Sequence, residues 1–507
     1  MGELMGPRGS RPSLGYAGFV MFAAHILSAA TGLLFTIMVV RSLTQAEFGI
    51  WQNMGDLVFY FTVLENVVPF WSKRFVARGF EGSGKTGLAC STLLGASVAL
   101  LYGVLAPLIM SIMGVGGSYL LPYMLISIQV FEIYVLRGLG AVLHPNRPQA
   151  VGYAIAVKEI TKLVAGFIFL LKLGLGLLGV VLSVLLAHAV QLTFNFLMAR
   201  GFLGGDFNWS YVREWGKGSF LPIYSFFGQR IPTLALFVLF AYAGDVARSY
   251  YGAAQAVGVV VFYSSFMAYA LYPRLLAGTG QGRSSGPEDV ERSLKLVLMF
   301  AIPLTLGAIL IPDLLLAGLF RRPEYVAACP VLMVLAPYYA FASLTSVMGS
   351  IVSGTEKVDA KAEVPVRELV RTRLFAYYSL FYATGAYLVA LSLLFIPSSP
   401  GPLDAALTLA LLSLGVSVAN FTVVYALARR CMEFSFPWRS TARYALASGA
   451  MCLALLFLPR IYRLSYALLA VGLGGVIYVA LLSAIDKEAR ELLRTLVDVI
   501  RRRGRRS

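Results

Sequence analysis

Charged residues are scarce in this chain of 507 residues, at only 13% of the total. A soluble domain carries about 25% charged and about 45–50% apolar residues. Here 58% of the residues are hydrophobic, and the mean hydropathy is +0.76. This composition excludes an ordinary soluble protein and a disordered one, and it indicates a chain whose solvent is the lipid bilayer.

Cysteine and histidine are also few, with four and three residues respectively. The cysteines lie in or beside apolar stretches without a Cys-x-x-Cys pair, and the histidines are far apart in the sequence. A disulfide framework and a sequence-local metal site are therefore not indicated. We expect neither a metal nor a cofactor.

Long polar stretches are absent as well. The longest cover 273–294, 353–373 and 486–507, and segments of this length cannot form a core of their own. A soluble catalytic domain is thus excluded. A membrane glycosyltransferase is disfavoured because the predicted outer loops hold only about five to ten residues, so we expect no catalytic residues and no enzyme.

Fourteen apolar segments make up the rest of the chain, and they predict an all-α polytopic membrane protein. The segments cover 15–40, 48–70, 87–113, 119–142, 150–171, 174–199, 218–243, 250–272, 295–317, 328–352, 374–397, 403–428, 441–458 and 464–485. The first is too long for the core of a cleavable signal peptide, so we expect it to remain as a membrane helix.

Basic residues outnumber acidic ones by 42 to 25, a formal net charge of +17. With the N-terminus inside, 32 of the 42 fall in inner segments, seven in outer segments and three within helices. Short basic loops stay in the cytoplasm, so we expect both termini on the cytoplasmic side of the cell membrane. The tail 486–507 has an amphipathic, basic pattern that favours binding to anionic lipid. The charge excess therefore indicates topology rather than a nucleic-acid partner.

An internal repeat relates two halves of the chain at a shift of 203 residues. The block 48–60 shares six identities with 251–263, including a glutamine and a Phe-Tyr pair in one register. Six segments separate the two blocks, which predicts lobes of equal orientation. We expect an N-lobe over 1–217 and a C-lobe over 218–440, followed by two helices over 441–485 and the cytoplasmic tail over 486–507.

Residues Gly79–Thr86 match the nucleotide-binding pattern G-x-x-x-x-G-K-T. A phosphate-binding loop needs a buried strand before it and a soluble helix after it. Here a basic segment precedes the match and a membrane segment follows it. We interpret the match as a short glycine-rich cytoplasmic loop and expect no nucleotide partner.

The stretch from Arg41 to Trp51, the basic exit at Lys73 and Arg74, the six-plus-six repeat and the two extra C-terminal helices resemble a known family. They are similar to the polysaccharide exporters of the multidrug/oligosaccharidyl-lipid/polysaccharide (MOP) superfamily, the Wzx-type flippases of lipid-linked sugars. The resemblance implies export of a polyprenyl phosphate or diphosphate oligosaccharide by alternating access between two lobes.

Basic residues inside the predicted helices are candidates for substrate binding, because a charge at mid-membrane costs roughly 2.5–3.5 kcal/mol and normally faces a cavity or a partner. Arg230 could grip phosphate oxygens, or it could form a structural ion pair. Lys158 and Lys162 share one helix face; either they line the cavity or they snorkel to the interface. His25 completes the candidate cavity residues.

Acidic residues inside the predicted helices are candidates for ion coupling or pairing: Asp56, Glu65, Glu132 and Glu159. Glu159 is expected to pair with Lys162. Asp56 and Glu65 are nine residues apart, so on one continuous helix they would point to opposite sides. At most one would face the cavity, and the other would pair with Arg230 or His25.

We therefore expect a flippase that moves a lipid-linked oligosaccharide from the inner to the outer leaflet, with membrane lipids and possible coupling H⁺ or Na⁺ as further partners. The alternative is a cation antiporter for drugs or metabolites in the same superfamily. A net positive cavity would favour the flippase, and a net negative one the antiporter.

Overall fold

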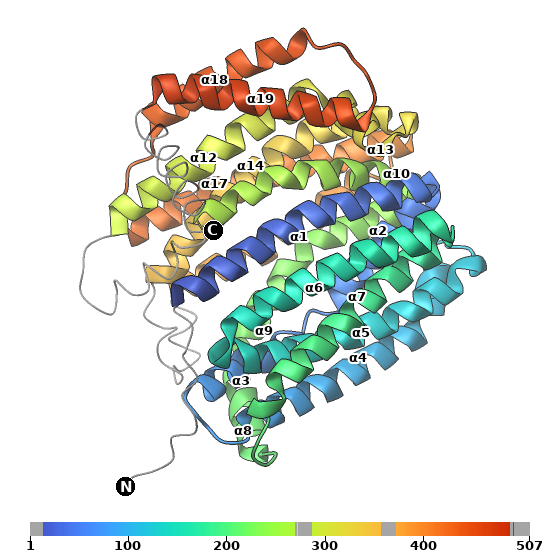
Figure 1. The fold of residues 1–507 in the computed structure, drawn as a ribbon, viewed down its shortest axis with the longest axis vertical. Coiled ribbons are helices and arrows are strands. Elements are labelled where there is room, and N and C mark those ends of the chain that lie inside the picture. The colour runs from blue at the N-terminus through green and yellow to red at the C-terminus, as the bar shows by residue number, and fades with distance from the viewer. Residues whose placement is uncertain (1–13, 269–270, 272–285, 356–371, 487–489, 491–507) are drawn as a thin grey trace, which may run out of the picture. The chain divides into compact units, whose positions relative to one another are not determined.

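The computed structural model describes residues 14–268, 271, 286–355, 372–486 and 490 (Figure 1). Within these residues the chain is helical and contains no strand. Ten of the described helical stretches are long and apolar enough to cross a membrane. The predicted all-α polytopic fold is confirmed, and the chain is a multi-pass membrane protein. Apart from Asp486 and Arg490, the predicted basic tail lies outside the described residues.

Two compact units make up the chain, residues 1–230 and 231–507. The first holds nine α-helices among its described residues: α1 (Leu14–Ser42), α2 (Gln45–Phe61), α3 (Val67–Ala77), α4 (Ser83–Ile112), α5 (Leu120–Asn146), α6 (Pro148–Gly166), α7 (Gly176–Ala199), α8 (Trp209–Gly218) and α9 (Phe220–Arg230). Helix α5 packs against α4 and α7, and α6 packs against α1 and α7.

The described part of the second unit contains eight α-helices: α10 (Leu234–Phe262), α12 (Gly286–Leu310), α13 (Pro312–Phe320), α14 (Cys329–Thr355), α16 (Arg373–Phe395), α17 (Pro402–Cys431), α18 (Trp438–Leu456) and α19 (Leu464–Ile485). Helix α14 packs against α10, α12 and α17, and α18 packs against α12 and α19.

Each of the fourteen predicted segments contains helix, but several are interrupted. The second segment divides into α2 and α3, with turns between them. The seventh divides at a 3-10 turn over Ile231–Thr233, and α10 then kinks at Gly244, where φ is +78°. The boundary between the two compact units falls inside the seventh segment, after Arg230.

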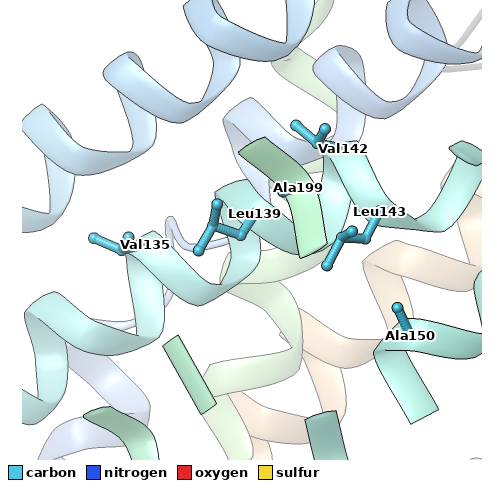
Figure 2. Close-up of a cluster of buried hydrophobic side chains, with 6 residues drawn as sticks. All are labelled: Val135, Leu139, Val142, Leu143, Ala150 and Ala199. Atoms are coloured by element: carbon cyan, nitrogen blue, oxygen red, sulfur yellow. The ribbon is translucent and has the colours of Figure 1, made fainter. Parts of the chain in front are cut away.

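Small and branched apolar side chains hold the first unit together. Figure 2 shows one buried cluster in which α5 contributes Val135, Leu139, Val142 and Leu143, and Ala150 and Ala199 come from α6 and α7. Glycines allow α4 and α5 to approach closely: a methyl group on Gly95 would collide with Tyr134. Such small-residue contacts are the usual means of helix association in lipid.

Candidate functional site

Glu65 lies in the break between α2 and α3, not on a continuous helix. The expectation that Asp56 and Glu65 point to opposite sides of one helix is therefore wrong in its premise. Backbone carbonyls at the break have partners. The Thr62 amide and hydroxyl both donate to the Val58 carbonyl, at 3.0 and 2.8 Å, and the Tyr134 hydroxyl donates to the Phe61 carbonyl at 2.9 Å. The break is thus compatible with a membrane interior, where backbone groups must be satisfied by the protein.

Two arginines share the Glu65 carboxylate. Arg137 Nη2 on α5 donates to Glu65 Oε1 at 3.1 Å, and Arg230 Nη2 on α9 lies 4.0 Å from the same oxygen. The Glu65 side chain is only 8% exposed, and the Arg230 guanidinium stacks 3.3 Å from the centre of the Phe59 ring. Of the pairings that the sequence left open for Asp56 and Glu65, the structure shows Glu65 near Arg230. These residues, Glu65, Arg137 and Arg230, form the arginine cluster.

Arg137 is not among the candidate residues of the sequence, because the count of basic residues by predicted topology places it with the inner segments. The structure places it within α5, nine residues before that helix ends at Asn146. Its position inside the predicted apolar segment 119–142 was the available signal. Arg248 is a second such case: it was counted with an outer connection, but it lies within α10 and is 1% exposed.

A second group, the lysine cluster, consists of Lys158, Glu159 and Lys162 on α6. Glu159 is 1% exposed, and its oxygens lie 2.9 Å from Lys158 Nζ and 2.6 Å from Lys162 Nζ. From α1, Ser28 and Thr31 donate hydrogen bonds to the same carboxylate at 2.9 and 2.7 Å. The predicted Glu159–Lys162 pair is confirmed. The ammonium groups of both lysines contact the buried Glu159 carboxylate, so neither side chain extends only toward the membrane interface.

Glu132 on α5 and His188 on α7 lie close together, and both side chains are largely buried. Glu132 Oε2 and His188 Nδ1 are 3.8 Å apart, beyond hydrogen-bonding distance, and neither atom has another hydrogen-bond partner among the described residues. His188 is within electrostatic range of Lys158, Lys162 and Arg137. It is thus close to both clusters.

The other two predicted site residues, His25 and Asp56, lie on α1 and α2. His25 is exposed on α1, and its Nδ1 lies 2.7 Å from the Met21 carbonyl oxygen of the same helix. Asp56 is half-buried on α2, one turn after Asn53, whose side chain accepts a hydrogen bond from Tyr123 at 2.9 Å.

The glycine-rich stretch Gly79–Thr86 has a structural explanation. Gly82 takes a left-handed conformation (φ +71°) at the start of α4, and a methyl group there would collide with the Asp206 backbone. Thr86 accepts a hydrogen bond from the Asn208 amide at 3.0 Å, and Lys85 donates one to the Gly205 carbonyl at 3.2 Å. The chain's own 205–208 segment therefore packs over the start of α4, where a nucleotide phosphate would have to bind.

Two arginine–aspartate ion pairs lie in the second unit. Arg460 lies 3.1 Å from Asp313, and Arg443 lies 3.2 Å from Asp486. Among the described residues of the whole chain, no group of three or more His, Cys, Asp or Glu side chains could hold a metal ion.

Comparisons with solved structures identify the architecture. The fold is similar to that of the lipid II flippase MurJ in an inward closed conformation, with a TM-score of 0.67 at 14% identity over 94% of this chain and 100% of that one. It is also similar to an inward-facing multidrug resistance MATE family transporter of the MOP superfamily, with a TM-score of 0.61 at 14% identity over 80% and 95% of the two chains.

The chain has the fold of the MOP superfamily. An outward-facing MATE family transporter also shares this MOP fold, with a TM-score of 0.55 at 14% identity over 82% of this chain and 95% of that one. Neither the family models nor the curated proteins include a match. The resemblance noted in the sequence is confirmed at the level of the fold, and the similar structures are those of a flippase and of transporters.

Proposed function

We propose that the chain is a flippase that moves a lipid-linked oligosaccharide from the inner to the outer leaflet, with its phosphate or diphosphate bound by cations of the first unit. The observation that carries this proposal is the number of cations per carboxylate. Glu65 is shared by Arg137 and Arg230, and Glu159 is shared by Lys158 and Lys162.

Two cations share one carboxylate in each cluster, so positive charge exceeds negative charge among these side chains. A phosphate oxygen could accept further charge-assisted hydrogen bonds from the same cations. Arginine suits this role because its planar guanidinium can bind phosphate through two parallel bonds. A cationic substrate would instead be repelled by both clusters.

Alternating access would expose this headgroup first inside and then outside, while the polyprenyl tail stays in lipid. The two predicted lobes, 1–217 and 218–440, would rock against each other in a cell membrane with both termini in the cytoplasm. Moving a negative charge outward gains about 2.3 kcal/mol per 100 mV of a cytoplasm-negative potential. Coupling to H⁺ or Na⁺ through Asp56, Glu65 or Glu132 would supply the remainder.

The alternative is a cation antiporter. The similarity to MATE transporters supports it, since that fold is shared at comparable coverage. The two clusters favour the flippase because cations outnumber carboxylates in each. Transport of a cationic dye by the purified protein, with no flipping of a lipid-linked sugar, would decide for the antiporter.

The test is a flipping assay in proteoliposomes with undecaprenyl diphosphate that carries a labelled disaccharide. We expect Arg137→Gln and Arg230→Gln each to lower the flipping rate about tenfold or more, because each removes a charge-assisted hydrogen bond of about 1.5–3 kcal/mol. Arg200→Gln is the matched control, since Arg200 is exposed at the end of α7 and belongs to neither cluster. Wild-type rates in both cluster variants would contradict the proposed phosphate site.

A further inference from the structure

A polar pocket opens between α14 and α16 of the second unit. Its volume is about 340 Å³, and it is lined by Ser346, Gly349, Ser350, Ser353, Leu374, Tyr377 and Tyr378. Small-molecule sites have volumes of roughly 300–1,000 Å³, so the pocket has room for one small ring-shaped ligand. None of the lining residues carries a charge, in contrast to the two clusters of the first unit.

Hydroxyl groups dominate the wall. Ser346, Ser350 and Ser353 are four and three residues apart, which places them on one face of α14. Ser350 donates to the Ser346 carbonyl at 3.1 Å, and the side chains of Ser346, Ser353 and Tyr377 also line the pocket. A hydroxyl group can both donate and accept a hydrogen bond, so this wall suits a ligand that also does both.

The tyrosine side of the pocket is held in place by its neighbours. Tyr377 packs edge-on against Phe381, with ring centres 5.1 Å apart. Its hydroxyl lies against the α14 backbone at Gly349, where a methyl group would collide with it. Only glycine at 349 leaves room for this approach, so the ring and its hydroxyl form a fixed wall opposite the serines.

We propose that this pocket binds a neutral sugar ring of the transported headgroup, an inference that rests on the proposed flippase function. A sugar offers hydroxyls that donate and accept, matching the serine and tyrosine hydroxyls, and an apolar face that can pack on a tyrosine ring. A cation or a phosphate would find no opposite charge among the lining residues. The phosphate and the sugar of one substrate would thus bind to different kinds of surface.

The location of the pocket suits this role. It lies near the end of α14 at Thr355 and the start of α16 at Arg373, which flank the segment 353–373. That segment carries five basic residues and is predicted to be cytoplasmic. A headgroup assembled in the cytoplasm would therefore meet this pocket on the side from which it enters.

The experiment compares two substrates in the same proteoliposomes: undecaprenyl diphosphate that carries a neutral hexose disaccharide, and undecaprenyl diphosphate alone. We expect the double variant Ser353→Ala/Tyr377→Phe to lower the flipping of the glycosylated lipid roughly tenfold, the effect of two lost hydrogen bonds, and to leave the bare lipid unchanged. Tyr387→Phe, on the same helix but exposed and away from the pocket, is the control and should affect neither substrate.

An equal loss for both lipids would overturn the inference, because it would show that the serines and Tyr377 only pack α14 against α16. Unchanged flipping of both lipids by the double variant would also overturn it. Flipping of the bare lipid serves as the folding control for each variant. If the wild-type protein flips neither lipid, the proposed function fails, and this inference fails with it.

Discussion

The Glu65 carboxylate accepts a hydrogen bond from Arg137 at 3.1 Å, although one residue lies in a helix break and the other lies well inside a membrane helix. The break brings the carboxylate to α5, and Arg230 approaches the same oxygen to 4.0 Å. A bound phosphate would have to compete with Glu65 for both guanidinium groups. Under the proposed function, the same carboxylate would hold the two arginines in place and oppose anion binding.

Glu65→Gln tests this competition. We expect the variant to bind inorganic pyrophosphate about tenfold more tightly, because the two arginines lose their counter-charge but keep their positions. The melting temperature should fall, since the Glu65 carboxylate no longer attracts Arg137 and Arg230. Calorimetric titration and thermal unfolding in detergent measure both effects. Unchanged or weaker pyrophosphate binding would show that Glu65 does not compete for the anion.

Glu159→Gln should destabilise the protein more strongly. It leaves Lys158 and Lys162 buried without an opposite charge, and loss of one partner of a buried ion pair costs about 3–5 kcal/mol. Replacement of all three residues by methionine should recover most of this loss, because an apolar group has no unpaired charge. Thermal unfolding of the two variants in the same detergent gives the comparison. A single variant as stable as the wild type would mean that water reaches the lysines.

The sequence predicted these ion pairs better than it predicted the backbone that holds them. The cost of charge in lipid singled out Glu65 and Arg230, and Lys158, Glu159 and Lys162, but not Arg137. The sequence did not show the break over 62–66, because 48–70 was treated as one apolar segment although Glu65 and Asn66 interrupt it and Pro69 stands in the first turn of α3. Arg137 and Arg248 were assigned to connections because counting basic residues by loop does not resolve where a helix ends.

Gly82 should matter far more than Lys85 for the glycine-rich segment. Gly82→Ala places a methyl group against the Asp206 backbone in a left-handed conformation, so we expect poor expression or a lower melting temperature. Lys85→Ala removes an exposed side chain and should leave folding, flipping and the lack of ATP binding unchanged. Filter binding of labelled ATP and the flipping assay test this. ATP binding that Lys85→Ala abolishes would restore the nucleotide interpretation.

The repeated Phe-Tyr blocks end in the same way in both units. In the first, α2 stops at Phe61 and the Thr62 hydroxyl caps the Val58 carbonyl; in the second, α10 stops at Phe262. There the buried Ser343 hydroxyl lies 3.2 Å from the Phe262 carbonyl and accepts a hydrogen bond from Ser264 at 3.2 Å. In each unit, hydroxyl groups thus donate to backbone carbonyls where the α-helix of the repeated block ends.

Thr62→Val and Ser343→Ala should each destabilise the protein by about 0.5–1.5 kcal/mol, the net contribution of one hydrogen bond. The loss stays this small because the Val58 carbonyl keeps the Thr62 amide and the Phe262 carbonyl keeps the Ser265 hydroxyl. Ser398→Ala is the control, because its hydroxyl is exposed and its loss leaves no buried group unpaired. Thermal unfolding of the three variants checks the expectation. If only one of Thr62→Val and Ser343→Ala is less stable than the wild type, the two helix ends are not equivalent. The repeat would then relate the two sequences but not the hydrogen bonds at their helix ends.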